Sequence, residues 1–161
     1  MHDTHPPPRI RNPFRLIPAA AGRQGSEDPE DVLGRRDARR DTQQRVLLVE
    51  DEFLLSEVLA ADLRAAGYDV VGPCPTLSAA MEAAQSQSFD GAILDINLKG
   101  QLVYPVAEEL ARRGVPFMFL SGYAHLSMPE QFRARPCLSK PADSTIVLHE
   151  VQNMLGANPI H

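Results

Sequence analysis

Four groups of residues in this 161-residue chain carry side chains that could do chemistry together. Each group lies at the C-terminal end of a short apolar run, which is typical of a buried strand. In an open α/β sheet, the carboxyl ends of parallel strands form one edge, and ligands bind in the crevice there. Carboxylates, a hydroxyl and an ammonium would meet at that edge. The groups are Glu50-Asp51-Glu52 after residues 46–49, Asp95 after 92–94, Ser121 after 117–120, and Lys140 before Pro141.

The acidic residues of these groups indicate a metal site. If the first and third strands are neighbours, Glu50, Asp51 and Asp95 meet within a short distance of one another. Like charges that close disfavour one another's ionisation unless a cation shares the site. Mg²⁺ is the natural occupant, because it takes one or two carboxylates together with waters and a phosphate oxygen. An acidic pair after a strand is commonly just solvated, so the prediction depends on the whole constellation.

The same residues suggest phosphoryl transfer. Asp95 is a candidate nucleophile, because carboxylates form acyl phosphates. Lys140, one of only two lysines in the chain, would add a positive charge beside the transferred group; the alternative is a simple surface charge. Ser121 would donate a hydrogen bond to a phosphoryl oxygen, although alone it would be an ordinary loop serine.

The pattern of apolar runs predicts the elements that position these residues. From residue 45 onward, five apolar runs alternate with five helical segments, which predicts a parallel sheet covered on both faces. The fourth helix is expected to be short and to begin at Ser127, because Ser127-x-x-Glu130 has capping-box spacing. The expected strands are 46–49, 69–72, 91–94, 117–120 and 136–138, and the expected helices are 53–66, 77–87, 103–113, a short one from 127, and 144–155.

Composition limits the domain organisation and the classes of partner. Residues 1–44 are rich in Pro, Arg and Asp without a helical or strand period, which predicts a disordered extension before a domain at 45–156 and a short tail at 157–161. The net charge of −5 argues against direct nucleic-acid binding. Cys74 and Cys137 lack metal-ligand spacing, and no apolar stretch suits a signal peptide or membrane helix. We therefore expect a cytoplasmic protein with no membrane contact.

Together these residues resemble the receiver domain of two-component response regulators. The motifs LLVEDE, AILDINLKG, FLSGY and LSKP stand in the order and at the separations of that family, over about two thirds of the chain. The resemblance implies a flavodoxin-like, doubly wound sheet with strand order 2-1-3-4-5. It also implies a phosphoprotein that uses Mg²⁺ and receives its phosphoryl group from a sensor histidine kinase or a phosphotransfer protein.

The resemblance assigns a role to each site residue. Asp95 matches the phosphoacceptor, Glu50 and Asp51 match the acidic metal pair, and Asn97 matches the residue whose backbone carbonyl binds Mg²⁺. Ser121 matches the switch hydroxyl and Lys140 the lysine that contacts the phosphate, with a cis bond to Pro141. These six roles are what the family implies at the matching positions.

Two features of the chain depart from the usual family pattern. Cys137 stands where members usually have Tyr or Phe, so the ordinary aromatic switch is absent; Tyr123 is a candidate replacement, with simple packing as the alternative. Cys137 itself is expected to be a small buried hydrophobe rather than a redox-sensitive thiol. The segment FLSGY resembles the FATGUY motif of an alphaproteobacterial subgroup of single-domain regulators linked to histidine kinases of the HWE or HisKA2 type.

The leading hypothesis is thus a phosphorylated receiver that signals through protein contacts with a downstream partner, or acts as a phosphate sink or shuttle. One alternative is a receiver-like adaptor that binds partners without phosphorylation, for which Cys137 is the main argument. Another is a phosphatase resembling haloacid dehalogenases, with Asp95-x-Asn97 as its motif; those enzymes have a second Asp where this chain has Asn97. We expect a signalling protein rather than an enzyme.

Overall fold

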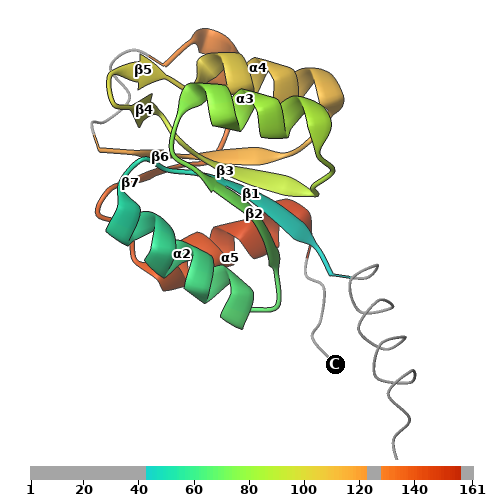
Figure 1. Cartoon of the computed structure of the whole chain (residues 1–161), viewed down its shortest axis with the longest axis vertical. Coiled ribbons are helices and arrows are strands. Elements are labelled where there is room, and N and C mark those ends of the chain that lie inside the picture. The colour runs from blue at the N-terminus through green and yellow to red at the C-terminus, as the bar shows by residue number, and fades with distance from the viewer. Residues whose placement is uncertain (1–42, 123–127, 157–161) are drawn as a thin grey trace, which may run out of the picture.

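The computed structural model of the chain describes residues 43–122 and 128–156, where a five-stranded sheet lies between two pairs of helices (Figure 1). Most of the expected extension at 1–44 and the expected tail at 157–161 lie outside these residues. Tyr123 and Ser127 also lie outside them. The division into an extension, a domain and a tail therefore stays a prediction.

The five strands of the main sheet are all parallel and stand in the order β2-β1-β3-β6-β7. This is the predicted order 2-1-3-4-5, because β4 and β5 belong to a separate small hairpin. The flavodoxin-like arrangement is confirmed. The strands are β1 (Arg45–Val49), β2 (Asp69–Cys74), β3 (Gly91–Asp95), β6 (Phe117–Ser121) and β7 (Cys137–Ser139), and the helices are α2 (Phe53–Ala65), α3 (Leu77–Ser86), α4 (Tyr104–Arg113) and α5 (Ser144–Leu155).

The central strands are apolar throughout because both faces of the sheet are covered. Helices α2 and α5 lie on one face, and α3 and α4 lie on the other (Figure 1). Successive side chains of a strand point to opposite faces, so Val46 and Leu48 join the core under α2 and α5, whereas Leu47 packs toward α3 and α4. All three are fully buried, and each such burial stabilises the fold by about 1.5–3 kcal/mol.

Polar and glycine residues set the helix ends. The Thr76 hydroxyl oxygen accepts a hydrogen bond from the Ala79 N–H at 3.2 Å and so caps α3. The Asp143 carboxylate accepts from the Thr145 N–H at 2.7 Å and caps α5 in the same way. Helix α4 ends at Gly114, whose φ of 70° is the left-handed conformation that glycine adopts without strain. These caps explain why the predicted helix boundaries are nearly correct.

A small hairpin that was not among the expected strands follows β3. Strands β4 (Asn97–Leu98) and β5 (Gln101–Leu102) pair antiparallel, with Lys99 and Gly100 between them. Both linking residues have positive φ, 51° and 90°, which suits a tight two-residue turn. The Asn97 side-chain oxygen stabilises the turn by accepting from the Gly100 N–H at 2.7 Å.

The fourth helix is the one predicted element that differs. In place of an α-helix, the described residues before β7 contain only a 3₁₀ helix, η1 (Glu130–Phe132), with Pro129 as its N-cap residue. Two prolines account for this outcome. Pro129 offers no N–H, and Pro136 disfavours the helical conformation of the residue before it, so few residues remain for a regular helix. The capping residue expected there, Ser127, lies outside the described residues.

Gly72 in β2 allows a direct test of the backbone geometry. Its φ is 99°, and a Cβ added there would lie 2.8 Å from both the Leu48 carbonyl oxygen and the Cys74 nitrogen. We expect Gly72→Ala to lower the free energy of unfolding by about 3 kcal/mol or more. The matched control is Gly114→Ala, where φ is also positive but nothing lies within 4 Å; we expect a loss of about 1–2 kcal/mol. Equal losses in urea unfolding would contradict the close contact at Gly72.

Candidate functional site

The predicted site residues converge at one edge of the sheet. Glu50 directly follows β1 and Asp95 ends β3, its neighbour in the sheet. Ser121 ends β6 and is opposite Ser139 of β7, and Lys140 comes directly after that strand. Parallel pairing therefore places the carboxyl ends of four strands side by side, as the apolar runs predicted.

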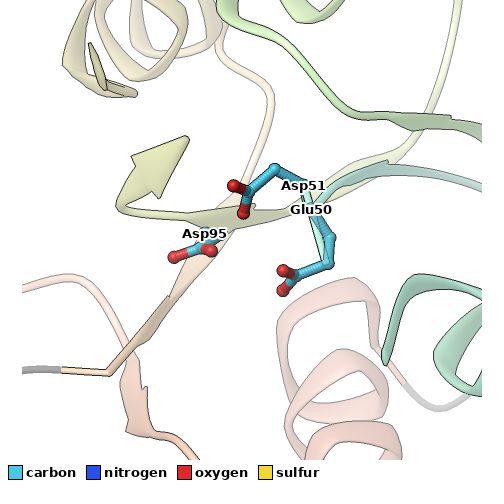
Figure 2. Close-up of side chains that lie close together, drawn as sticks. All are labelled: Glu50, Asp51 and Asp95. Atoms are coloured by element: carbon cyan, nitrogen blue, oxygen red, sulfur yellow. The ribbon is translucent and has the colours of Figure 1, made fainter. Parts of the chain in front are cut away.

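Three carboxylates form the centre of the site. Glu50, Asp51 and Asp95 each offer an oxygen, and these oxygens all lie within 4.8 Å of one another. Figure 2 shows the three side chains turned toward a common space from the ends of β1 and β3. Glu50 and Asp95 are only 1% and 5% exposed, whereas Asp51 is half-buried. The arrangement concentrates negative charge where little water reaches.

Backbone N–H groups hold each carboxylate in place. The Glu52 N–H donates to Glu50 Oε1 at 3.0 Å, and the Asn97 N–H donates to Asp95 Oδ1 at 3.2 Å. The Lys99 N–H donates to Asp51 Oδ2 at 3.1 Å, so the tip of the β4–β5 hairpin positions this acid. The sequence reasoning missed this contact. The Asn-x-x-Gly spacing of residues 97–100 indicates a turn, but it does not show that the Lys99 N–H reaches Asp51.

Lys140 compensates part of the negative charge. Its Nζ lies 2.7 Å from Glu50 Oε2 and 2.8 Å from Asp95 Oδ2. Burial acts to lower the pKa of Lys140, but the hydrogen bonds and charges of Asp95 and Glu50 outweigh it and raise the pKa above its usual value. The ammonium therefore stays protonated at neutral pH. Among the described residues, Lys140 is the cation paired with these acids, and its single charge does not balance all three.

The shortage of positive charge at the site is clearest at Glu50. Burial raises the pKa of its carboxyl, against the lowering effect of Lys140 and of the Glu52 N–H. Its Oε2 atom is buried and faces a cation already, the Lys140 ammonium at 2.7 Å. A buried oxygen in that state suits a cation ligand. The donor set of carboxylate oxygens with room for waters fits Mg²⁺.

The remaining predicted residues frame the acids. The side chain of Ser121 is buried at the end of β6, and its backbone carbonyl accepts from the Lys140 N–H at 2.7 Å, joining β6 to the lysine. The Lys140–Pro141 bond is cis, as the family resemblance implied. Asn97 is exposed, and its side chain is engaged with Gly100 rather than turned to the acids. The metal-binding role of its carbonyl stays a prediction.

Cys137 is half-buried in β7 and packs against the core under α3 and α4. Burial raises the pKa of its thiol, so little reactive thiolate is present at neutral pH. The packing agrees with a small apolar residue. Tyr123, the other residue considered for an aromatic switch, lies outside the described residues.

Comparison with known families identifies the domain. The model of the response regulator receiver domain matches residues 46–152, which is well over half of the chain. The chain belongs to the response regulator receiver family. Receivers are signalling proteins of two-component systems, so the regulator interpretation takes precedence over the phosphatase one.

Among the described residues, no helix has the length and apolar character needed to cross a bilayer.

A curated relative and two solved structures illustrate the match. The transcriptional regulatory protein PdtaR of Mycobacterium tuberculosis is 32% identical over 98 residues, 60% of this chain and 48% of PdtaR, so the chain spans about half the length of this relative. SdrG of Sphingomonas melonis is 36% identical, with a TM-score of 0.62 over 70% of this chain and 97% of SdrG. The receiver domain of the sensor histidine kinase PA1611 of Pseudomonas aeruginosa, which has magnesium coordinated in its active-site cleft, is 27% identical, with a TM-score of 0.63 over 71% and 99%.

Removing the ammonium should make stability depend on pH. In Lys140→Met without added metal, Glu50 and Asp95 lose their cation, and we expect a loss of about 3 kcal/mol near pH 7.5. The pKa of Glu50, already above 4.5, would rise further. Between the pKa of Glu50 in the unfolded chain and its raised pKa in the folded variant, the folded state binds more protons than the unfolded state. Stability therefore falls as the pH rises through this range and recovers toward pH 5. Urea unfolding at several pH values measures this.

The matched control for this prediction is Arg112→Met. Arg112, in the last turn of α4, pairs with Glu109 at 2.6 Å and is not among the residues that contact the acids in the described structure. Exposed pairs of this kind contribute little, so we expect no measurable change in stability at any of these pH values. A Lys140→Met protein as stable as the wild type, with the same pH profile, would show that the ammonium does not compensate the acids.

Proposed function

We propose that this chain accepts a phosphoryl group on Asp95 from a histidine kinase or a phosphotransfer protein, with Mg²⁺ held by Glu50, Asp51, Asp95 and the backbone carbonyl of Asn97. The observation that carries the proposal is the meeting of three carboxylates with a single ammonium at one edge of a receiver fold. A carboxylate nucleophile, a metal site and a mobile cation are the groups that phosphoryl transfer to an acid needs.

The residues divide the chemistry between them. An oxygen of Asp95 bonds to phosphorus while the bond from phosphorus to the donor's imidazole nitrogen breaks, and that nitrogen keeps the electron pair. Bound Mg²⁺ supplies charge neutralisation for the phosphoryl oxygens. Lys140 Nζ, already 2.8 Å from Asp95, transfers its contact to the new phosphoryl oxygens. The Ser121 hydroxyl donates a hydrogen bond to one of them.

Phosphorylation would also change the balance of charge. The acyl phosphate carries more negative charge than the carboxylate that it replaces, and it adds strong acceptor oxygens. Lys140 is then drawn away from Glu50, and Ser121 is drawn toward the phosphate. Because Ser121 ends β6, its movement pulls on the chain that follows. The protein would thus signal through protein contacts, or act as a phosphate sink or shuttle.

The central prediction concerns Asp95. Incubated with Mg²⁺ and acetyl phosphate, the wild-type chain should gain about 80 Da, the mass of one phosphoryl group. Asp95→Asn should gain nothing, and omission of Mg²⁺ with a chelator present should abolish the gain in the wild type. Intact-mass spectrometry measures the adduct.

The matched control for this experiment is Asp69→Asn. Asp69 begins β2, at the opposite edge of the sheet from the acids, and it pairs with Arg45. It should acquire the phosphoryl group like the wild type. A folded wild-type chain that gains no mass from acetyl phosphate or from any phosphorylated kinase would contradict the proposal.

The phosphodonor has an apolar surface to bind beside the site. Leu54 and Val58, one turn apart on α2, are 73% and 53% exposed, and Phe53 is 73% exposed. Across the site, Ile146 on α5 is 56% exposed. Between α2 and the start of α5 lies a hollow of about 510 Å³ that Leu55, Lys140 and Ala142 help to line. Apolar side chains around a charged centre suit the helices that carry a phosphorylated histidine.

The proposed type of kinase rests on the segment around Ser121. Residues 119–123 read FLSGY, and their likeness to the FATGUY motif supports a donor of the HWE or HisKA2 type. The apolar surface on α2 does not by itself distinguish between kinase types. Faster labelling of Asp95 by conventional kinases than by HWE or HisKA2 kinases would contradict this assignment.

Charge placed on the α2 surface should separate donor binding from chemistry. In the double variant Leu54→Asp, Val58→Asp, phosphotransfer from an autophosphorylated HWE or HisKA2 kinase should slow about tenfold or more, because central apolar contacts carry most of the binding energy. Labelling by acetyl phosphate should not change. The control is Leu102→Asp, which changes an apolar residue that is 47% exposed on the hairpin. Equal slowing by the control would show that α2 is not the docking surface.

A phosphorylation-independent adaptor is the second candidate. Cys137 favours the adaptor, because this position lacks the aromatic side chain whose movement is usually coupled to that of the switch hydroxyl. The two functions differ in one result. An adaptor would bind its downstream partner equally well as wild type and as Asp95→Ala, whereas a phosphorylated receiver would lose the phosphorylation-dependent part of that affinity.

A further inference from the structure

Tyr104, the first residue of α4, joins parts of the fold that lie far apart in sequence. Its ring stacks on Phe132 of η1, with centroids 5.9 Å apart and planes inclined by 22°. It also meets Phe119 of β6 edge-on, at 6.2 Å and 81°. Phe119 and Phe132 are themselves in edge contact at 5.8 Å. These three rings form the Tyr104 cluster, a rigid unit between α4, β6 and η1.

One side of the Tyr104 cluster is tied to the phosphoacceptor loop. Ile96 directly follows Asp95, and its carbonyl accepts from the Val103 N–H at 3.0 Å. Val103 is fully buried and precedes Tyr104. The Ile96 N–H in turn donates to the Leu120 carbonyl at 3.0 Å, one residue before Ser121. A shift of residues 95–96, the Asp95 loop, would therefore reach Tyr104 through the Ile96–Val103 hydrogen bond and the peptide unit that joins Val103 to Tyr104.

The other side of the Tyr104 cluster reaches the chain between β6 and β7. Phe132 is the buried anchor of η1, at 3% exposed. Cys137 of β7 is paired with Phe119, and it lies close enough to Tyr104 for a thiolate there to raise the pKa of the tyrosine, after the larger effect of burial. The outer side of η1 is joined to α4 by a hydrogen bond from Gln131 to Glu108 at 3.3 Å.

We propose that Tyr104 is the positioning residue through which phosphorylation of Asp95 changes η1 and the adjoining side of α4, the surface that a downstream protein would contact. The inference rests on the proposed function, because it needs Asp95 to be phosphorylated. A closely packed ring cluster responds to a displacement as a unit, since gaps between its rings would forfeit their contacts. In this proposal, Tyr104 of α4 couples Asp95 to η1, and the coupling does not require an aromatic residue at position 137.

The experiment uses the full chain with Mg²⁺ and beryllofluoride, which mimics a phosphoryl group on a carboxylate. Amide signals at Asp95 and Lys140 report on the site, and those at Gln131 and Arg133 report on η1, in ¹H–¹⁵N spectra. In the wild type, both sets should shift. In Tyr104→Leu, the site signals should shift as in the wild type, while the η1 shifts fall by about half or more, because the packed chain of contacts is broken.

Two further variants separate coupling from general packing. Tyr104→Phe keeps the ring and should keep the η1 response. Phe117→Leu removes another buried ring, one that meets Phe119 and Phe132 edge-on but lies at the start of β6, away from the site. It should lower stability and leave the η1 response. Equal η1 shifts in Tyr104→Leu and the wild type would overturn the proposal, as would an equal loss of response in Phe117→Leu.

A measurement on the wild type keeps the test decisive if Tyr104→Leu does not fold. The ring ¹H–¹³C signals of Tyr104 should move when beryllofluoride binds; unmoved ring signals beside shifted site signals would refute the coupling. Absence of any shift at Asp95 and Lys140 in the wild type is a different result, since it would contradict the proposed phosphorylation and this inference with it.

Discussion

The contact of one ammonium with two buried acids is the interaction on which the site depends. Lys140 Nζ lies within 2.8 Å of both Glu50 and Asp95, and Asp51 adds a third negative charge nearby. Without the lysine, buried carboxylates would be protonated or would destabilise the fold. With it, the acids stay charged and near one another, but the compensation is incomplete. The same shortage of positive charge that limits stability makes the site receptive to a divalent cation and, through it, to a phosphoryl group.

Such an arrangement needs a rigid support, and the sheet provides it. Residues 46–49, 91–95 and 117–121 are buried along their whole length, so the strand ends cannot shift without disturbing packing on both faces. Backbone N–H groups then position each acid, and the Lys140 side chain joins Glu50 to Asp95. Even Asp51, the most exposed acid, is held by the Lys99 N–H at the tip of the β4–β5 hairpin.

The sequence was sufficient for the sheet, its order and the convergence of the site residues, because continuous apolar runs have few structural interpretations. It was insufficient where short-range geometry decides. The hairpin after Asp95 depends on positive φ at Lys99, a non-glycine residue whose conformation composition does not signal. The 3₁₀ helix before β7 replaced an expected α-helix because two prolines bound the segment. The contact of Tyr104 with Phe119 and Phe132 arises from packing between elements distant in sequence, which no local pattern records.

The two faces of the sheet differ in a way that separates receiving a signal from passing it on. The core under α3 and α4 contains the rings of Tyr104, Phe117, Phe119 and Phe132, whereas the core under α2 and α5 is mainly aliphatic. Exposed apolar side chains lie on α2 and α5, the helices of the aliphatic side. Rigid rings connect the Asp95 loop to η1 on the other side. Because the site lies at the edge shared by both faces, the proposed function would let a donor bind on one side and a downstream partner bind on the other without displacing it.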